Sequence, residues 1–233
     1  AMLYRAGVRV VIPPEYLCCG YPLVANGRGA QAEAIAYENS VTFHRIAETV
    51  SYMNIGHVLV TCGTCKEMLA RYRLEEIFVD SVLMDVNEFL VGQGLWTTEG
   101  VTDGAVLFHE PCHSPISSGA SAKVVSALLN KSAVMIPRCC GEGGTLALST
   151  PHISTVLRSR KAKLIGDAAG TPGVTVLTTC PSCVQGLSKI HGAVRVTGRS
   201  LIVAAAQLRL GGRWKREFVA DVRRANAIEH ILF

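Results

Sequence analysis

The stretch between Cys139 and Cys183 begins with Cys-Cys-Gly and ends with Cys-Pro-Ser-Cys. An earlier stretch, from Cys18 to Cys65, begins with the same triplet and ends with Cys-Gly-Thr-Cys. The two CCG triplets are 121 positions apart (139 − 18), and the two CxxC pairs are 118 apart (180 − 62). A shared order of motifs at a nearly constant separation indicates an internal repeat. The sequence therefore predicts one duplicated unit.

The residues around these motifs repeat as well. Each CCG triplet follows an apolar run that contains a proline, each CxxC pair follows a β-branched run, and a further short run comes later: VRVVIP at 8–13 and AVMIP at 133–137, VLVT at 58–61 and VLTT at 176–179, VLMD at 82–85 and AVRV at 193–196. Short β-branched runs are typical of buried parallel strands. Apolar residues recur at three- and four-residue spacing over 30–53 and 152–169, which predicts a helix between each triplet and its pair.

Alternating strands and helices predict an α/β fold. Because short right-handed crossovers make neighbouring strands parallel, we expect two tandem repeats, each a small parallel sheet flanked by helices, over residues 1–98 and 99–233. The cysteine motifs then lie just past the carboxyl ends of strands, where open α/β sheets bind their ligands. Helix N-termini at that edge direct amide groups at bound anions. The sequence therefore predicts one ligand site in each repeat, with cysteines at its centre.

The second unit has a further cysteine, Cys112, in the setting HEPCH after the strand-like residues 105–108. Cys112 stands 27 positions before Cys139 (139 − 112), and the helix-like residues 126–130 lie between them. In the first unit, residues 1–4 align with the middle of that helix. The equivalent of Cys112 would therefore lie before residue 1. We expect the chain to be a fragment of a longer protein, with a first repeat that lacks its opening strand and first cysteine.

Composition and charge narrow the class of protein. Of the 233 residues, 49% are hydrophobic and 18% are charged, which is typical of a globular chain and excludes a disordered one. The net charge is only +5, and the densest basic residues, at 213–216 and 223–224, read as the solvated face of a terminal helix rather than a nucleic-acid surface. No apolar stretch reaches the ~18 residues of a membrane span, and no secretory signal opens the sequence. We expect a cytoplasmic protein, held at a membrane, if at all, through a partner.

The number of cysteines points to metal or redox chemistry. In a reducing compartment clustered cysteines bind metal or carry out redox work, and an odd number cannot all pair within one chain. Thiolates bind iron tightly and bridge between irons. Adjacent cysteines such as Cys139 and Cys140 can reach two irons of one cluster, and Gly141 lets the backbone turn away. The predicted metal ligands are all nine cysteines: Cys18, Cys19, Cys62, Cys65, Cys112, Cys139, Cys140, Cys180 and Cys183.

Other interpretations of the same residues stay open. Four cysteines within one unit also satisfy a tetrahedral structural zinc ion. His109 and His113 flank Cys112, and we expect them to pack or hydrogen-bond near the site, with metal ligation or proton relay as the alternative. Glu142 follows the second CCG triplet, and we expect it to cap a helix N-terminus, where negative charge is favourable, rather than to donate protons.

Two ordered sets of CCG and CxxC, the second preceded by a Pro-Cys-His cysteine, resemble the cysteine-rich CCG domain family. The segments CCGYP, CGTC, HEPCH, CCGEGGTLA and TCPSCVQGLS carry the resemblance, which covers nearly the whole chain. The family includes the CCG-containing component of heterodisulfide reductase, iron–sulfur subunits of glycolate oxidase and of anaerobic glycerol-3-phosphate dehydrogenase, and lactate-utilisation proteins. The chain looks most similar to the C-terminal CCG region of large bacterial FAD-linked oxidases of the D-lactate dehydrogenase type.

The resemblance implies an iron–sulfur cofactor. In heterodisulfide reductase each five-cysteine set holds a non-cubane 4Fe–4S cluster. By that resemblance Cys112, Cys139, Cys140, Cys180 and Cys183 would bind a 4Fe–4S cluster in the second repeat, and Cys18, Cys19, Cys62 and Cys65 would be four of five ligands for another in the first. The spacing from Cys112 to Cys139 is shorter than usual for the reductase, so cubane and non-cubane geometries both stay open.

The resemblance also implies partners. The sequence contains no GxGxxG dinucleotide fingerprint after a strand, so FAD is expected only on a partner domain or subunit, and this chain alone is expected to oxidise no hydroxy acid. One hypothesis is an electron-transfer domain between a flavin-containing dehydrogenase for a D-lactate-like acid and an acceptor (quinone, ferredoxin or disulfide). The alternative is a catalytic cluster that itself reduces a disulfide or quinone. A structural zinc domain is the third reading.

Overall fold

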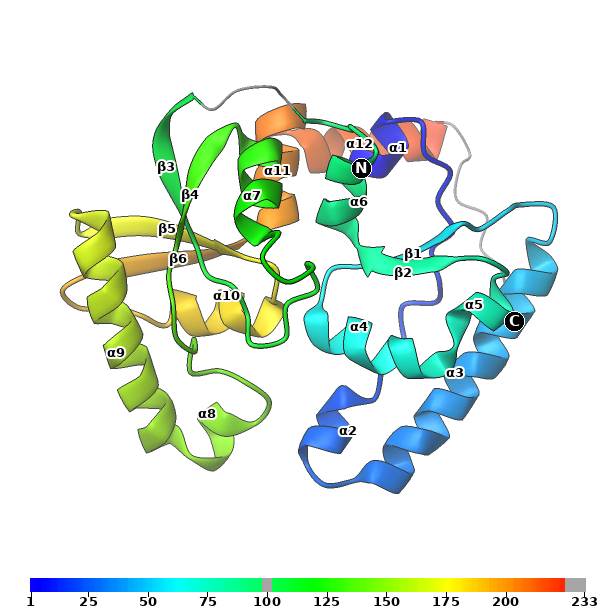
Figure 1. The fold of residues 1–233 in the computed structure, drawn as a ribbon, viewed down its shortest axis with the longest axis horizontal. Coiled ribbons are helices and arrows are strands. Elements are labelled where there is room, and N and C mark those ends of the chain that lie inside the picture. Colours follow the sequence, from blue (N-terminus) through cyan, green and yellow to red (C-terminus); the bar gives the residue numbers. More distant parts are fainter. Residues whose placement is uncertain (98–101, 225–233) are drawn as a thin grey trace.

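The structure, a computed structural model, describes residues 1–97 and 102–224. It consists of two lobes side by side, each with a parallel sheet and helices (Figure 1). In both lobes strands and helices alternate, and the CxxC motif follows a strand. The predicted α/β fold with parallel sheets flanked by helices is confirmed.

The first lobe is built around a two-stranded sheet. Strands β1 and β2 pair in parallel, with His57 opposite Val82 and Val60 opposite Asp85. Its elements, in chain order, are α1 (Met2–Arg5), α2 (Tyr21–Ala25), α3 (Gly29–Thr49), β1 (His57–Val60), α4 (Gly63–Leu69), a 3-10 turn (Ala70–Tyr72), α5 (Leu74–Ile77), β2 (Val82–Asp85) and α6 (Val86–Gly92).

The second lobe contains a four-stranded parallel sheet in the order β4-β3-β5-β6. The helix predicted over 152–169 is α9, which begins with a proline in its first turn and ends at Gly170 in the left-handed conformation. The elements are β3 (Thr102–Phe108), α7 (Ser121–Leu129), β4 (Lys131–Met135), α8 (Leu146–Ser149), α9 (Pro151–Ala169), β5 (Gly173–Thr178), α10 (Pro181–Ser188), β6 (Arg195–Ser200), α11 (Leu201–Leu210) and α12 (Trp214–Arg224).

The strand expected at residues 8–13, before the first CCG triplet, is a wrong prediction. This run has no strand structure, and Ile12 is 77% exposed. Its counterpart β4 pairs with β3, but no equivalent of β3 is present in the part of the first lobe that the structure describes. An apolar run without a neighbouring strand has no partner for its backbone hydrogen bonds, so it stays irregular.

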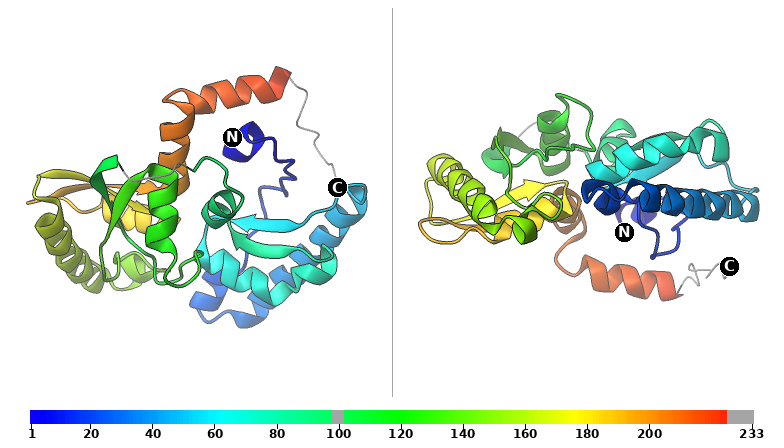
Figure 2. Two further views of the ribbon diagram at one scale, coloured as in Figure 1. Left: turned by 45° about the horizontal axis from the view of Figure 1, so that its top comes forward. Right: turned by 90° about the horizontal axis from the view of Figure 1, so that it is seen from below.

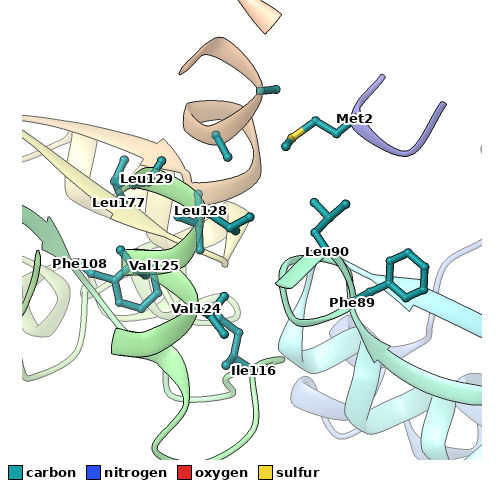
Figure 3. Packing of buried hydrophobic residues seen from close by; sticks show 13 residues of the cluster. Met2, Phe89, Leu90, Phe108, Ile116, Val124, Val125, Leu128, Leu129 and Leu177 are labelled. Atoms are coloured by element: carbon teal, nitrogen blue, oxygen red, sulfur yellow. The ribbon is translucent and has the colours of Figure 1, made fainter. Parts of the chain in front are cut away.

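A hydrophobic core crosses between the lobes (Figure 3). Helix α6 of the first lobe lies against α7 and α11 of the second, and Leu90 is fully buried in the cluster that also contains Val125, Leu128 and Leu201. Each lobe has in addition a core of its own, one around residues 46 and 78 and the other around residues 165 and 176. Because residues from both lobes share one cluster, the division into domains at residues 98 and 99 stays a prediction.

The last described helix returns toward the start of the chain. Helix α12 passes close to α1, where the rings of Phe218 and Tyr4 lie 5.5 Å apart and Asp221 pairs with Arg5 (Figure 2). The basic residues at 213, 215, 216, 223 and 224 are exposed, as expected for the solvated face of a terminal helix. Within the described ranges, no helix is both long enough and apolar enough to cross a membrane.

Candidate metal centres

Every cysteine motif except the first CCG triplet lies just beyond the carboxyl end of a strand. Cys62 follows β1 and is the N-cap residue of α4, while Cys180 follows β5 and is the N-cap residue of α10. Cys112 follows β3, and Cys139 follows β4. Because parallel strands end at the same edge of a sheet, the turns that carry these residues converge. This is the position that the sequence predicts for a ligand site.

In the first lobe one thiol is hydrogen-bonded to two others. A hydrogen bond from Cys65 is the main cause that lowers the pKa of Cys19 to about 6 and that of Cys62 to about 5. The same two bonds raise the pKa of Cys65 itself. Cys18 is exposed, and no hydrogen bond of its thiol joins this group. The structure therefore brings Cys19, Cys62 and Cys65 together, with Cys18 beside them.

The second lobe repeats this arrangement with more thiols. Cys183 is hydrogen-bonded to Cys140 and to Cys180, which raises the pKa of Cys183 and lowers that of Cys180 to about 7. A bond from Cys139 is the first cause that lowers the pKa of Cys140. Cys112 is exposed, and it is near enough to act electrostatically on Cys139. Hydrogen bonds therefore join four of the five predicted cysteines of this repeat, and Cys112 lies near them.

These shared protons are what a metal would replace. Thiolates bind metals after their protons leave, and several thiols that compete for few protons are ready ligands. Cys140 and Cys183 are 3% and 5% exposed, and their sulfur atoms and a ring nitrogen of His109 all lie within 4.8 Å of one another. The Nε2 atom of His109 is buried and bonds to no nitrogen or oxygen atom, and a hydrogen bond between the His109 ring and Cys140 also lowers the pKa of Cys140. The chemistry of these thiols and of the imidazole beside them fits a bound metal or cluster.

A buried lysine, missed by the sequence analysis, lies behind this site. The Nζ of Lys161 donates to the carbonyl oxygens of Ile136 (2.8 Å), Pro137 (2.8 Å) and Arg138 (3.0 Å), and it is 2.9 Å from Nδ1 of His109. Burial lowers the pKa of Lys161 to about 8, and the nearby thiolates oppose that shift. His109 therefore does hydrogen-bond near the site, as expected.

The loop before the second CCG triplet is held from the first lobe too. A Cβ atom on Gly63, the first residue of α4, would lie 1.7 Å from the carbonyl oxygen of His113. The His113 ring contacts Glu67 Oε2 through Nδ1 (2.6 Å) and the Tyr21 hydroxyl through Nε2 (3.3 Å). His113 thus pairs with groups of the first lobe instead of facing the thiols of its own repeat.

The two cysteine sites are neighbours across this contact. The charge of Cys62 in the first lobe acts on Cys180 in the second. Lys66 of α4 donates to the carbonyl oxygen of Pro115, three residues after Cys112, at 2.6 Å. The lobes therefore place their cysteine motifs toward one shared interface.

The expectation that Glu142 caps a helix is wrong. Helix α8 begins after Thr145, and Glu142 lies three residues earlier. Its carboxylate is buried and pairs with Arg158 of α9 (3.4 Å) and with Lys189 after α10. A buried carboxylate is stabilised more by two cations than by a helix end, so Glu142 ties the turn after the CCG triplet to both helices.

Comparison with known proteins finds distant relatives. An uncharacterized iron–sulfur protein of Methanococcus maripaludis is 29% identical over 190 residues, which are 78% of this chain and 35% of that protein. One of Methanocaldococcus jannaschii is 27% identical over 188 residues (78% and 35%), and lactate utilization protein A of Oceanobacillus iheyensis is 26% identical over 188 residues (71% and 71%). The chain thus spans about a third of the length of the first two relatives.

No solved structure gives a significant match. The profile of the CCG family, described as a cysteine-rich domain, matches residues 1–70 and 106–188, and these two stretches contain all nine cysteines. One stretch lies within each lobe and contains the thiols that are hydrogen-bonded there. The chain therefore belongs to the cysteine-rich CCG domain family and contains the domain in two copies.

Proposed function

We propose that this chain binds iron–sulfur clusters and carries electrons for a flavin-containing dehydrogenase of a 2-hydroxy acid such as D-lactate. The observation that carries the proposal is the hydrogen-bonded group of four cysteines at the second site, two of them buried, beside the buried ring of His109. The names of the relatives support it, because they are iron–sulfur proteins and lactate utilization protein A.

In this proposal all nine cysteines are ligands. The second site would use Cys112, Cys139, Cys140, Cys180 and Cys183, and the first would use Cys18, Cys19, Cys62 and Cys65. A 4Fe–4S cluster supplies one-electron redox chemistry when bound. The N-terminus of α10, where Cys180 accepts from the backbone N–H of Cys183 at 3.4 Å, adds amide donors that stabilise anionic sulfur.

The dehydrogenase chemistry itself is assigned to another part of the protein or to a partner. FAD would be bound there, and the acceptor of the electrons would be a quinone, a ferredoxin or a disulfide. Burial of Cys140 and Cys183 favours electron transfer through the site, because a cluster at that depth exchanges electrons without binding a substrate.

One observation favours a second function. Cys112 is exposed, whereas Cys140 and Cys183 of the same site are buried, so one side of the site faces solvent. A cluster with an open side can bind the sulfur or oxygen of a substrate. We therefore keep reduction of a disulfide or quinone at the second site as the alternative.

Anaerobic purification with iron and sulfide analysis tests the proposal. Each filled site should contain about four irons and four labile sulfides, and the reduced protein should give an EPR signal. Cys139→Ser should remove the signal of the second site, and the matched variant Cys18→Ser should leave it in place. The shape of the signal separates cubane from non-cubane geometry. Stoichiometric zinc without sulfide, even after anaerobic reconstitution, would establish a structural zinc domain instead.

A further inference from the structure

Helices α3 and α9 lie in the same register behind the two CCG turns. A Cβ atom on Gly20 would contact the carbonyl oxygen of Ala32 at 3.4 Å, and one on Gly141 would contact that of Ser154 at 2.9 Å. These helix residues are therefore equivalent. Seven positions further along, which is two helical turns, α3 has Asn39 and α9 has Lys161. The two repeats thus differ at one equivalent buried position.

Asn39 and Lys161 both donate hydrogen bonds to backbone carbonyl oxygens at a CCG turn. Asn39 is 5% exposed and donates to the carbonyl oxygen of Cys18 (2.7 Å), at the first CCG triplet. Lys161 is fully buried and donates to three carbonyl oxygens of residues 136–138, directly before the second triplet. Each side chain holds the approach to a CCG turn against its helix. Only Lys161 brings a positive charge.

That charge is not needed to hold the turn. Taking an ammonium group out of water is costly, and Asn39 shows that a neutral donor is sufficient at this position. Among the residues that the structure describes, Lys161 is the only buried lysine or arginine. The thiolates of Cys140, Cys183 and Cys139 act on it electrostatically, so it lies within range of the site. A buried charge retained at this place points to an electrostatic role.

Lys161 also determines how His109 presents its ring. An ammonium group has only donors, so a proton on Nδ1 of His109 would face Nζ at 2.9 Å without an acceptor. Nδ1 is therefore unprotonated, and Nε2 carries the proton of the neutral ring. Nε2 bonds to no nitrogen or oxygen atom of the protein, and the His109 ring lies beside the sulfur atoms of Cys140 and Cys183 and hydrogen-bonds to Cys140. An N–H group at that place can donate to sulfur.

We propose that Lys161 sets the redox asymmetry of the two sites: its charge, and the N–H of His109 that it orients, favour the reduced state at the second site only. Both effects stabilise added negative charge, so they raise the reduction potential there. The first site has the neutral Asn39 at the equivalent position. Electrons that enter the chain would therefore come to rest at the second site. This inference rests on the proposed function, because it needs a cluster to act on.

The test is an EPR-monitored redox titration of the anaerobically loaded protein. In Lys161→Gln the amide keeps donors for the carbonyl oxygens and removes the charge. The second site should become harder to reduce, with an equilibrium constant for reduction at least tenfold smaller, or about 59 mV for one electron. The first site should not change. Cys140→Ser, which should remove the signal of the second site, assigns the two signals.

Two further variants make the result specific. His109→Phe keeps Lys161 and removes the N–H donor, so it should shift the second site in the same direction by a smaller factor, and it serves if Lys161→Gln does not fold. Asn39→Ser changes the equivalent position without changing charge, and it should leave the potential of the second site unaltered. A loaded Lys161→Gln protein with the wild-type potential would overturn the inference while the proposed function stands. Wild-type protein that binds no iron or sulfide would overturn both.

Discussion

The two lobes place the same thiols in the same order on unequal sheets. In each, the last cysteine of CxxC is hydrogen-bonded to the second cysteine of CCG and to the first of CxxC. The first lobe does this with two strands, and the second with four. A strand, its CxxC turn and the helix behind the CCG triplet are thus sufficient to assemble the thiols.

What differs between the lobes is the surroundings of the thiols. Cys140 and Cys183 are buried, whereas their counterparts Cys19 and Cys65 are partly exposed. The second site has a buried lysine and a buried histidine beside it, whereas no lysine, arginine or histidine is buried among the described residues of the first lobe. The cysteine motifs therefore determine which thiols hydrogen-bond to one another, while the neighbouring strands and helices determine how deeply these thiols are buried and which charges lie beside them.

We expect the largest difference between the lobes at the second position of CxxC, which is Gly63 in the first lobe and Pro181 in the second. Gly63→Ala would place a Cβ atom 1.7 Å from a backbone carbonyl oxygen of the other lobe, and backbone on both sides cannot move apart cheaply. We expect the free energy of unfolding of the metal-free protein to fall by about 3 kcal/mol, measured by urea denaturation.

Gly29→Ala is the matched control for that prediction. Gly29 begins α3, and its Cβ atom would meet nothing within 4 Å. Alanine there should leave stability unchanged or raise it by up to about 1 kcal/mol, because it restricts the unfolded chain. Equal effects of the two substitutions would mean that the lobes do not meet as closely at Gly63 as described.

A smaller difference in stability is expected between alanine substitutions at the glycines of the two CCG triplets. Gly20 and Gly141 both have positive φ, at 84° and 79°, so alanine at either position has a left-handed strain of roughly 1–2 kcal/mol. At Gly141 the new Cβ atom would also meet Ser154 O at 2.9 Å and Arg158 Cγ at 3.0 Å, whereas at Gly20 the nearest atom is 3.4 Å away. We expect Gly141→Ala to lower the free energy of unfolding by about 1 kcal/mol more than Gly20→Ala.

The same urea titrations decide this prediction. Each variant is compared with wild type at one pH, so that only the crowding behind the CCG turn differs between the two. A larger loss for Gly20→Ala would show that α3 packs against its triplet more tightly than α9 does, contrary to the distances.

Much of this fold follows from local patterns in the sequence. The runs before CxxC are strands, and the helical periodicities over 30–53 and 152–169 correspond to α3 and α9, because spacing and β-branching act over a few residues. The run at 8–13 failed because a strand needs a neighbour. Lys161 was missed because a lone lysine on a helix reads as a solvated residue. Aligning the two repeats on their CCG triplets would have placed it opposite Ser40, and only the contacts of Gly20 with Ala32 and of Gly141 with Ser154 make Asn39 its equivalent.

The charges at the site were harder to predict than the thiols. Cysteine spacing predicted thiols at the strand ends, and three of the four CCG and CxxC motifs do follow a strand. Glu142 was expected at a helix end, but its partners Arg158 and Lys189 come from two different helices. Ion pairs of this kind depend on how elements that are distant in the sequence pack against each other. Residue spacing within one sequence does not predict that packing.

The helices that follow β2 and β6 supply the smallest test, because their N-cap residues are Asp85 and Ser200. Asp85 is fully buried; Oδ1 accepts from the backbone N–H groups of Asn87 (2.8 Å) and Glu88 (3.2 Å), and Oδ2 has no partner. Burial raises the pKa of Asp85 above 3.8. The folded state therefore holds this proton more tightly than the unfolded state, and the resulting stability is lost as the pH rises from below 3.8 through the raised pKa.

Asp85→Asn keeps the accepting oxygen and does not titrate. Relative to wild type, the variant should therefore gain stability between pH 3 and pH 7, by on the order of 1 kcal/mol, in urea titrations at several pH values. Ser200→Ala is the control: the Ser200 side chain makes no capping hydrogen bond, so its effect should be within about 0.5 kcal/mol and independent of pH. A difference between Asp85→Asn and wild type that stays constant with pH would mean that Asp85 ionises as easily in the folded lobe as in the unfolded chain. The N-cap residue after β2 would then make stability no more dependent on pH than the N-cap residue after β6.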